Sequence, residues 1–352
     1  MRIALLHYTA APVIGGVERV IADQARALRR LGHEVEVRTK GTGAPEGFDA
    51  VVVHNVFTMP FDLGWTRELR AAAAAAAARQ GTRWFNWVHD VAAVNPYYAH
   101  LPWEDEAHAM LREAPRCVHV TVSEARREDY VRATGLAKEA IQVIPNGLEL
   151  AEVLGLTERV SGLRLWEHDL VLFHPTRLIR RKNIELGIRV CAELRGRGCA
   201  AVYVVTGAPD PHQADGVRYH QELKSQAEEL GVSKDVLFVG EAGALSDEDV
   251  RGLYAVADCL FFPSKGEGFG LPLLEAAMHR LPVFCSDLAV HREVMGDRGQ
   301  VFHLESEAGT IAEQIFAWAA GAPEVARRRV VWRQHDMFKI CQERLEPLLR
   351  IG

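Results

Sequence analysis

The sequence lacks long hydrophobic runs, closely spaced cysteine pairs and any excess of positive charge. No apolar run reaches the about 20 residues that a bilayer-spanning helix needs, and the longest candidate, the alanine tract 71–78, lies between two arginines. The six cysteines form no Cys-x-x-Cys pair and mostly lie in apolar stretches, which favours buried, reduced thiols. No charged and then apolar leader precedes the first apolar run at 2–7. We therefore expect a cytoplasmic protein.

The formal net charge of −6 is spread evenly along the chain. Residues 1–158 carry 17 Lys+Arg against 20 Asp+Glu, and residues 159–352 carry 24 against 27, so each half has a net charge of −3. A nucleic-acid-binding domain is normally basic, so nucleic acid is not expected as a partner. The even split also gives weak attraction to anionic lipid. The basic residues around 327–333 leave membrane association open, but nothing indicates it.

Short apolar, β-branched runs alternate with longer helical stretches, which is the pattern of βαβ units and parallel sheets. The expected strands are 2–7, 34–38, 50–54, 83–88, 118–122, 141–144, 170–174, 201–206, 236–239, 259–262, 282–285 and 301–303. The expected helices are 16–31, 66–80, 104–113, 124–134, 184–196, 217–230, 248–256, 271–279 and 308–320.

The alternation breaks once, near 148–168, where the sequence is mixed and polar and has no strand period. At about 150 residues per domain the chain is long enough for two domains. We expect a first domain over 1–158, a second over 159–322 and a helical, basic tail over 323–352. The fold class is α/β, with two doubly wound, Rossmann-like domains facing across a cleft. The carboxyl ends of their strands are the default ligand site of this architecture.

The most informative segment is 262–275, a glycine-rich connection from an expected strand to an expected helix. Its glycines let the backbone approach a ligand closely, and a new helix N-terminus favours an anion such as phosphate. Glu267 lies in the loop and Glu275 about one turn into the helix, so both can face one pocket and bind hydroxyls. The alternative is a plain glycine-rich connection with two solvated carboxylates.

Two competing motifs are disfavoured. A dinucleotide-binding GxGxxG must follow the first strand of a βαβ unit, with an acid about 20 residues further on. Neither the glycines of 266–270 nor Gly15-Gly16 match that pattern. The acidic stretch Asp247–Asp249 follows Ser246 and is typical of a helix N-cap with acids in the first turn rather than of a metal site. No metal is implied.

A basic segment follows the first expected strand of the second domain. Arg177 and Lys182 could converge on one diphosphate, one from the strand end and one from the helix start. Asn183 is the expected N-cap, and Arg180 and Arg181 are expected to face solvent. The alternative is a basic helix start, although cations there oppose the helix dipole unless a ligand anion offsets them.

The first half offers three weaker candidates. Gly15-Gly16 at the first strand-to-helix connection can bring backbone N–H groups to a ligand, or can be a plain tight turn. His89 ends an apolar strand and can bind a hydroxyl or a phosphate or act as a base, but it can equally be structural. Tyr97, Tyr98 and Trp103 lie in one loop and could stack on a sugar ring, or could pack as a surface loop.

At these residues the chain resembles the retaining glycosyltransferases of family 4, which have the GT-B fold. The resemblance lies in the PS-x-x-EGFGLP-x-LE segment with Glu267 and Glu275, the R-x4-K of Arg177 and Lys182, Ile-Pro-Asn-Gly at 144–147, Gly15-Gly16 and His89-Asp90. These motifs occur in the expected order along the whole chain. The resemblance implies a nucleotide-sugar donor (GDP-, UDP- or ADP-sugar) held mainly by the second domain and an acceptor held by the first.

The resemblance also implies a role for each matched residue of the second domain. Arg177 and Lys182 would neutralise the donor diphosphate. Glu275 would hold the ribose hydroxyls, and Glu267 would contact the sugar hydroxyls near the reacting carbon. The further donor-binding residues would be Gly268, Phe269, Gly270 and Leu271.

The first domain would complete the site. The backbone of Gly16 would approach the diphosphate, and His89 would bind a hydroxyl of the donor sugar. The tail would cross back onto the first domain. The acceptor candidates are Tyr97, Tyr98, Trp103 and Asn146.

Retention of configuration needs either a covalent intermediate, for which Glu267 is the motif carboxylate placed to be the nucleophile, or a same-face route. The resemblance favours the same-face route, in which the leaving diphosphate takes the acceptor proton and no cofactor is needed. A glucose- or mannose-like sugar and an unknown acceptor are expected. A nucleotide-sugar epimerase on the same scaffold and a bilobed, non-catalytic sugar-binding protein are the alternatives.

Overall fold

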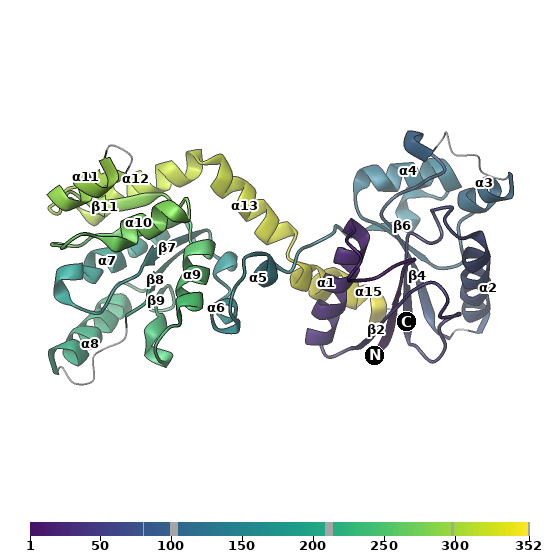
Figure 1. The fold of residues 1–352 in the computed structure, drawn as a ribbon, viewed down its shortest axis with the longest axis horizontal. Helices are drawn as coiled ribbons and strands as arrows, with labels where there is room; N and C mark the ends of the chain where they lie inside the picture. Colours follow the sequence, from purple (N-terminus) through teal and green to yellow (C-terminus); the bar gives the residue numbers. More distant parts are fainter. Residues whose placement is uncertain (80, 99–104, 208–213, 297–298, 351–352) are drawn as a thin grey trace. The chain divides into compact units, whose positions relative to one another are not determined.

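The computed structural model describes residues 1–79, 81–98, 105–207, 214–296 and 299–350 of the chain. Its contacts divide the chain into two compact units (Figure 1). The first unit consists of residues 1–150 together with 334–352, and the second unit consists of residues 151–333. Each unit has its own six-stranded parallel sheet with helices around it. The expected fold class, two doubly wound α/β units in tandem, is therefore confirmed.

The first unit has the strand order β2-β1-β3-β4-β5-β6. Its strands are β1 (Arg2–Leu6), β2 (Glu34–Arg38), β3 (Ala50–His54), β4 (Arg83–Val88), β5 (Val118–Thr121) and β6 (Ile141–Val143). Its helices are α1 (Gly16–Arg30), α2 (Leu63–Arg79), α3 (Asp105–Arg112), α4 (Glu124–Thr134), α14 (Met337–Ile340) and α15 (Glu346–Arg350). The order reverses between β1 and β3, and a ligand crevice is expected outside the carboxyl ends of those strands.

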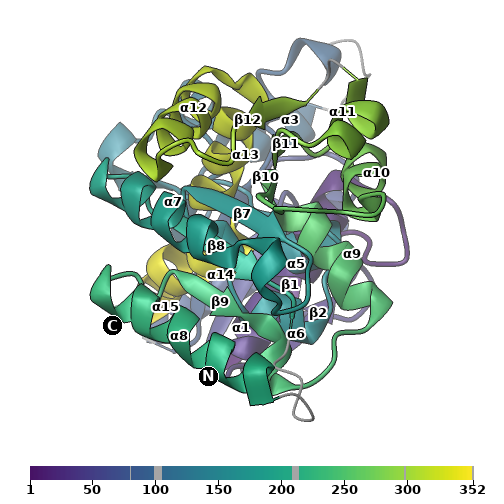
Figure 2. The same ribbon diagram turned by 90° about the vertical axis from the view of Figure 1, so that its left-hand side faces the viewer.

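The second unit has the strand order β12-β11-β10-β7-β8-β9. Its strands are β7 (Leu170–His174), β8 (Ala201–Val205), β9 (Val236–Phe238), β10 (Cys259–Phe262), β11 (Val283–Ser286) and β12 (Gln300–Phe302). Its helices, with α5 and α13 at its borders, are α5 (Leu150–Val153), α6 (Glu158–Gly162), α7 (Ile184–Gly196), α8 (Ala214–Glu229), α9 (Asp247–Val256), α10 (Leu271–Met278), α11 (Ala289–Met295), α12 (Ala308–Gly321) and α13 (Pro323–Gln334). Figure 2 shows the same ribbon turned by 90° about the vertical axis, with β7, β8 and β9 of this unit labelled.

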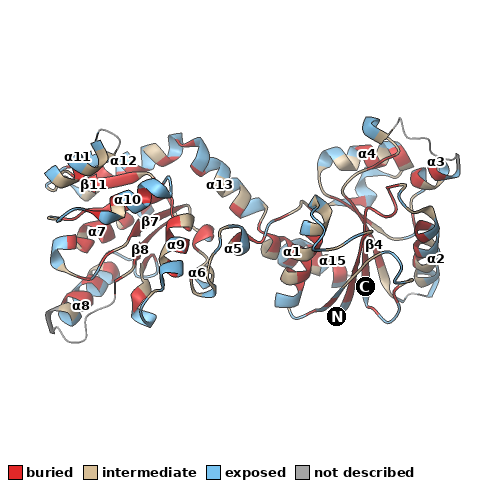
Figure 3. Cartoon of the chain, viewed as in Figure 1, coloured by how far each residue is buried: buried red, intermediate tan, exposed pale blue. Residues whose placement is uncertain are grey.

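The expected strands agree with the observed ones to within one residue at each end. Strands buried on both faces form near-continuous apolar runs in a parallel sheet, and the burial pattern of the central strands fits that description (Figure 3). The acidic stretch Asp247–Asp249 is the first turn of α9, and Ser246 and Asp249 form a capping box there. The expectation of a cap at this point is confirmed. Helices α5, α6 and α11 were not expected, because they are short.

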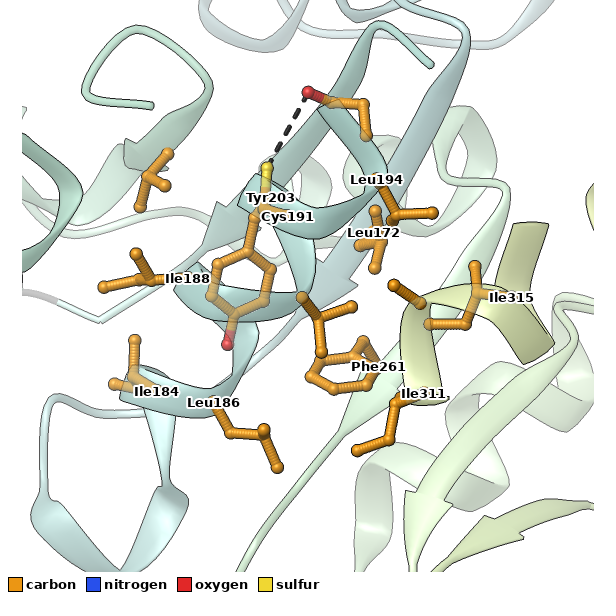
Figure 4. Close-up of a cluster of buried hydrophobic side chains, with 14 of the residues drawn as sticks. Leu172, Ile184, Leu186, Ile188, Cys191, Leu194, Tyr203, Phe261, Ile311 and Ile315 are labelled. Carbon is orange, nitrogen blue, oxygen red and sulfur yellow. Dashed lines mark hydrogen bonds between the residues drawn. The ribbon is translucent and has the colours of Figure 1, made fainter. Parts of the chain in front are cut away.

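The core of the second unit lies between its sheet and helices α7, α8 and α12 (Figure 4). Gly187 of α7 faces the ring of Tyr203 on β8, and a Cβ at Gly187 would overlap that ring. The absence of a side chain at Gly187 therefore brings α7 close to the sheet. Tyr203 is fully buried, and its hydroxyl lies 2.5 Å from Nδ1 of His174 at the end of β7.

The end of the chain belongs to both units. Helix α13 up to Arg333 belongs to the second unit, and only residues 334–352 belong to the first. The expected boundaries after residues 158 and 322 therefore differ from the observed divisions after 150 and 333. The apolar side chains that join the core of the first unit follow α13, and they are Met337, Ile340, Cys341, Leu345 and Leu349.

Residues 323–333, the first part of the expected tail, precede the division at 333 and belong to the second unit. Trp332 is buried in the second unit, where the guanidinium of Arg328 lies 5.3 Å from the centre of its ring.

All six cysteines are free thiols, and five of them are buried. None of the helices within the described residues is long and apolar enough to cross a bilayer.

Candidate active site

The strand order of the second unit reverses between β7 and β10, which pair directly. In a doubly wound sheet, ligands bind outside the carboxyl ends of the strands at such a point. Arg177 and Lys182 follow β7, and Glu267 follows β10. Two motifs that lie far apart in the sequence are therefore brought to one place by the sheet.

Glu267 is the centre of an ion-pair cluster. Lys182 Nζ donates a hydrogen bond to Glu267 Oε1, and Arg181 Nη1 lies 3.3 Å from Glu267 Oε2. Arg181 also donates a hydrogen bond of 2.7 Å to the carbonyl oxygen of Gly266. The side chains of Lys182 and Glu267 are only 11% and 7% exposed. Arg181 is exposed, as expected, and its guanidinium also bonds the loop that carries Glu267.

The cluster keeps Glu267 ionised. Burial by itself would raise the pKa of Glu267, but the hydrogen bond and the positive charge of Lys182, together with hydrogen bonds from Ser264 and Arg181, outweigh burial and lower the pKa below its usual value. Lys182 Nζ also lies 5.1 Å from the centre of the Phe262 ring, a cation–π distance. Because both charges are largely buried, removing either partner would leave the other uncompensated.

The glycine-rich turn after Glu267 leads into α10. Gly270 has a φ of 92°, a left-handed conformation that favours glycine. A Cβ at Gly268 would meet nothing within 4 Å. Phe269 and Leu271 are 52% and 62% exposed, so both offer apolar surface beside a helix start whose first N–H groups have no partner within the helix. This surface can receive an anion and the body of a ligand.

Glu275 has a different partner from Glu267. Its Oε2 accepts a hydrogen bond of 2.6 Å from the hydroxyl of Tyr254, and the Tyr254 ring stacks on His279 at a centroid distance of 5.0 Å. Glu275 itself is exposed. The structure thus holds one carboxylate within an ion-pair cluster and leaves the other on the surface as an acceptor for hydroxyls.

Arg177 is the cation left without a protein partner. Its side chain is exposed and makes no hydrogen bond or ion pair with any of the described residues. Gly207, after β8, lies against its backbone, since a Cβ at Gly207 would come 2.9 Å from Arg177 Cα. Arg177 and Lys182 do not contact each other, but both lie after the same strand.

Asn183 occupies the N-cap position of α7, as expected, but its side chain makes no capping hydrogen bond. It adopts a positive φ of 54°, and its amide donates instead to the carbonyl oxygen of Pro263 at 3.1 Å. This bond ties the start of α7 to the segment that carries Glu267.

In the first unit, His89 follows β4 and lies within a chain of polar side chains. His89 Nε2 lies 3.0 Å from Nδ1 of His54, and His89 Nδ1 lies 3.3 Å from Nδ2 of Asn146. Asn55, at a positive φ of 61°, accepts hydrogen bonds from the backbone N–H groups of His89 and Asp90. Burial, followed by the charge of His7, lowers the pKa of His89 to about 3. The imidazole is therefore neutral at physiological pH.

Gly15 and Gly16 begin α1 after β1. A Cβ at Gly15 would overlap the carboxylate of Glu18, which accepts a hydrogen bond from the hydroxyl of Thr9, whereas a Cβ at Gly16 would meet nothing within 4 Å. The carboxylate of Glu18 therefore lies over the start of α1, a position that favours negative charge.

Tyr97 and Tyr98, two of the acceptor candidates, belong to a group of aromatic rings. Tyr97 is 80% exposed and meets Tyr98 edge to face at 5.3 Å, and Tyr98 meets Phe61 at 6.4 Å. Tyr8 continues the series, because its ring lies 5.3 Å from that of Phe61. Trp103 lies outside the described residues.

Sequence reasoning missed several residues that the site contains. Arg181, Tyr254, His54 and Glu18 all contact an expected site residue. Tyr254 and His54 lie within apolar, element-forming stretches, where a polar residue gives no periodic signal. Glu18 could have been noticed as an acid in the first turn after a glycine pair. Among the described residues, no group of three or more His, Cys, Asp or Glu side chains is placed to hold a metal ion.

Two domain families match the chain. The family described as "Glycosyl transferases group 1" matches residues 162–329, and the family described as "Glycosyltransferase Family 4" matches residues 14–105. An uncharacterized glycosyltransferase of Methanocaldococcus jannaschii is 24% identical over 84% of this chain and 83% of its own length. Mannosylglucosylglycerate synthase of Petrotoga mobilis is 25% identical over 83% of this chain and 70% of its own length.

Other similarities are shorter or have lower identity. The serotype-specific mannosyltransferase WbdA of Escherichia coli is 37% identical over 100 residues, which are 27% of this chain and only 12% of WbdA. Among solved structures, Anabaena HepE in complex with UDP and glucose is 19% identical, covers 99% of both chains and has a TM-score of 0.41.

Proposed function

The chain belongs to the family 4 glycosyltransferases and is a sugar-transferring enzyme, and on that premise we propose that it moves a hexosyl group from a nucleoside diphosphate hexose to an acceptor hydroxyl with retention of configuration. The second unit holds the donor, and the first unit holds the acceptor and offers His89 to the transferred sugar. The observation that carries this proposal is the buried Lys182–Glu267 pair at the strand-order reversal of the second unit.

Arg177 and Lys182 of the second unit stabilise the leaving group. The bond from the anomeric carbon to the diphosphate breaks, and negative charge develops on the phosphate oxygen. Arg177, which has no partner among the described residues, and Lys182 stabilise that charge, because donors placed in advance need no reorganisation during the reaction. The start of α10 adds its N–H groups to the same anion.

The acceptor proton goes to the leaving diphosphate. The acceptor oxygen approaches the face of the sugar that the diphosphate leaves, forms the new bond to the anomeric carbon and passes its proton to the departing phosphate oxygen. Glu267 stays ionised within its ion pairs, accepts hydrogen bonds from the sugar hydroxyls and stabilises the oxocarbenium-like carbon. Glu275 accepts from the ribose hydroxyls, with Tyr254 fixing its carboxylate.

The names of the relatives favour mannose as the first sugar to test and glucose as the second. WbdA and the O-antigen chain mannosyltransferase B of Escherichia coli are named as mannosyltransferases, and Mannosylglucosylglycerate synthase is named for both sugars. The acceptor would be a sugar that binds beside the rings of Tyr97 and Tyr98, because exposed rings can stack on the apolar face of a sugar ring.

Thermal unfolding with a panel of nucleotide sugars tests the donor, with UDP-, GDP- and ADP-linked glucose and mannose. A donor at about 100 times its Kd stabilises the folded protein by roughly 2.7 kcal/mol, which raises the Tm by several degrees. The control is the free sugar with the free nucleoside monophosphate. A panel in which no nucleotide sugar shifts the Tm would contradict the proposal.

Product analysis then distinguishes the reactions. We expect a new glycoside and release of the nucleoside diphosphate, with the anomeric configuration of the donor retained by NMR. An isomerised nucleotide sugar would instead identify an epimerase, and binding without any product would identify a sugar-binding protein.

A further inference from the structure

The imidazole of His89 is held by a second histidine. His54 ends β3 and His89 follows β4, and these two strands pair side by side. Nδ1 of His54 lies 3.0 Å from Nε2 of His89, and the two rings stack at a centroid distance of 5.3 Å. His54 is fully buried, whereas His89 is half-buried. A ligand therefore cannot replace His54 as the partner of Nε2.

The other nitrogen of His89 has a partner that can be displaced. Nδ1 lies 3.3 Å from Nδ2 of Asn146, a long hydrogen bond to a half-buried side chain. The Oδ1 of Asn146 is buried and has no hydrogen-bond partner among the described residues. When a hydroxyl takes its place beside Nδ1, the Asn146 amide loses only this one long hydrogen bond, because its Oδ1 has no partner to lose.

We propose that His54 is the positioning residue of His89: it fixes the ring and its proton so that Nδ1 of His89 is the atom offered to a hydroxyl of the transferred sugar. Asn146 occupies that place in the free enzyme. The inference rests on the proposed function, in which His89 binds a sugar hydroxyl.

The proton arrangement follows from the hydrogen bond between the two rings. When Nδ1–H of His54 donates, Nε2 of His89 accepts, so the proton of neutral His89 is on Nδ1 and is donated to the hydroxyl oxygen. This arrangement is incompatible with the hydrogen bond from Nδ2 of Asn146, which can only donate, and so requires that Asn146 has left. When Nε2–H of His89 donates, Nδ1 of His89 carries a lone pair and accepts the hydroxyl proton. In both cases the tautomer of His54 determines whether Nδ1 of His89 donates or accepts. A residue at position 54 that lacks Nδ1 does not fix the tautomer of His89.

The test compares substitutions of His54 that differ only in the group offered to His89. His54→Phe keeps the size of a buried ring and removes Nδ1, and we expect kcat to fall on the order of 10-fold, the effect of one lost hydrogen bond. His54→Asn places an amide near the position of Nδ1 and should restore most of the turnover. The Kd values of GDP and UDP, measured by calorimetry, should stay unchanged in both variants, because the second unit binds the nucleotide.

A second histidine of the first unit provides the control. His119 is buried and has its Nδ1 3.2 Å from the hydroxyl of Tyr130, so His119→Phe removes a similar hydrogen bond elsewhere and should leave kcat unchanged. In a His89→Ala background, His54→Phe should cause no further loss, since it acts through His89. If His54→Phe does not fold, His54→Asn and His54→Gln replace it, and only His54→Asn should keep turnover.

Wild-type kcat in His54→Phe, or a loss that adds to that of His89→Ala, would overturn the positioning role alone. Wild-type kcat in His89→Ala would overturn the role of His89 in the proposed function and the positioning role with it.

Discussion

At the residue scale, Lys182 combines a structural contact with the role in binding the diphosphate that we propose for it. Its ammonium group is largely buried, bonds Glu267 and lies over the ring of Phe262. Arg177 is exposed, so it can bind an anion without giving up a protein partner. In the proposed mechanism Lys182, in contrast, shares its charge between Glu267 and the anion.

Lys182→Ala is expected to abolish most turnover while the protein still folds. By analogy with a lost oxyanion donor, the lost charge costs about 2.7–4 kcal/mol of transition-state stabilisation, or about 10²–10³ in kcat. The measurement is kcat with the donor that the panel identifies, together with the circular dichroism spectrum. Arg189→Ala, which changes an exposed cation of α7, is the control, and near wild-type turnover in Lys182→Ala would contradict the assignment.

At the scale of elements, the close contact of α7 with its sheet fixes where the basic segment lies. Lys182 directly precedes α7, so the position of that helix on the sheet determines the position of the ammonium group. Gly187 allows the contact, because its missing side chain makes room for the ring of Tyr203.

Gly187→Ala is therefore expected to destabilise the second unit despite the better helix propensity of alanine. The added methyl group would overlap Tyr203, and overpacking a core costs about 1–3 kcal/mol. Gly196→Ala, at the last residue of the same helix, is the matched control, since its Cβ would meet nothing within 4 Å, and it should be neutral or slightly stabilising. Urea unfolding measures both, and equal stability of the two variants would refute the packing argument.

At the scale of the whole molecule, both units contain buried, neutral histidines. Burial lowers the pKa of His54, of His89 to about 3, of His119 to about 4 and of His174 to about 3. In the unfolded chain these groups titrate near 6.5. The unfolded state therefore binds more protons than the folded state at pH values between about 6.5 and about 3.

The free energy of unfolding is consequently expected to fall as the pH drops below about 6.5 and to keep falling toward about 3. The reason is that this free energy increases with pH wherever the unfolded state binds more protons than the folded state. Urea titrations at pH 7.5, 6 and 5 measure the slope. His174→Phe removes one of these groups and should make the decline shallower in the second unit. An unfolding free energy that does not change between pH 7.5 and 5 would contradict the expectation.

Prediction from the sequence was most accurate for features that depend on residues close together along the chain. Apolar runs such as Leu170–His174 become buried parallel strands, and the acids after Ser246 become a capped helix start. The same reasoning predicted Lys182 and Glu267 separately, as candidate ligand-binding residues. It could not show that they pair with each other, because that contact depends on the reversal of strand order between β7 and β10.

Other contacts were beyond a reading of one sequence. His54 ends an apolar strand, so nothing in its neighbourhood separates it from an ordinary core residue, and its contact with His89 comes from the pairing of β3 with β4. The start of the tail was placed too early for a similar reason. Trp332 is apolar and lies in a helix, and only the tertiary contacts show that it belongs to the second unit while Leu345 belongs to the first.

The division of the first unit between residues 1–150 and 334–352 has a consequence for how the protein is made. A ribosome releases the second unit in one uninterrupted piece, so that unit can fold as soon as it has emerged. The first unit has to wait with part of its apolar surface uncovered until Met337, Ile340 and Leu345 have been synthesised. The half that is translated first is thus the half that is completed last.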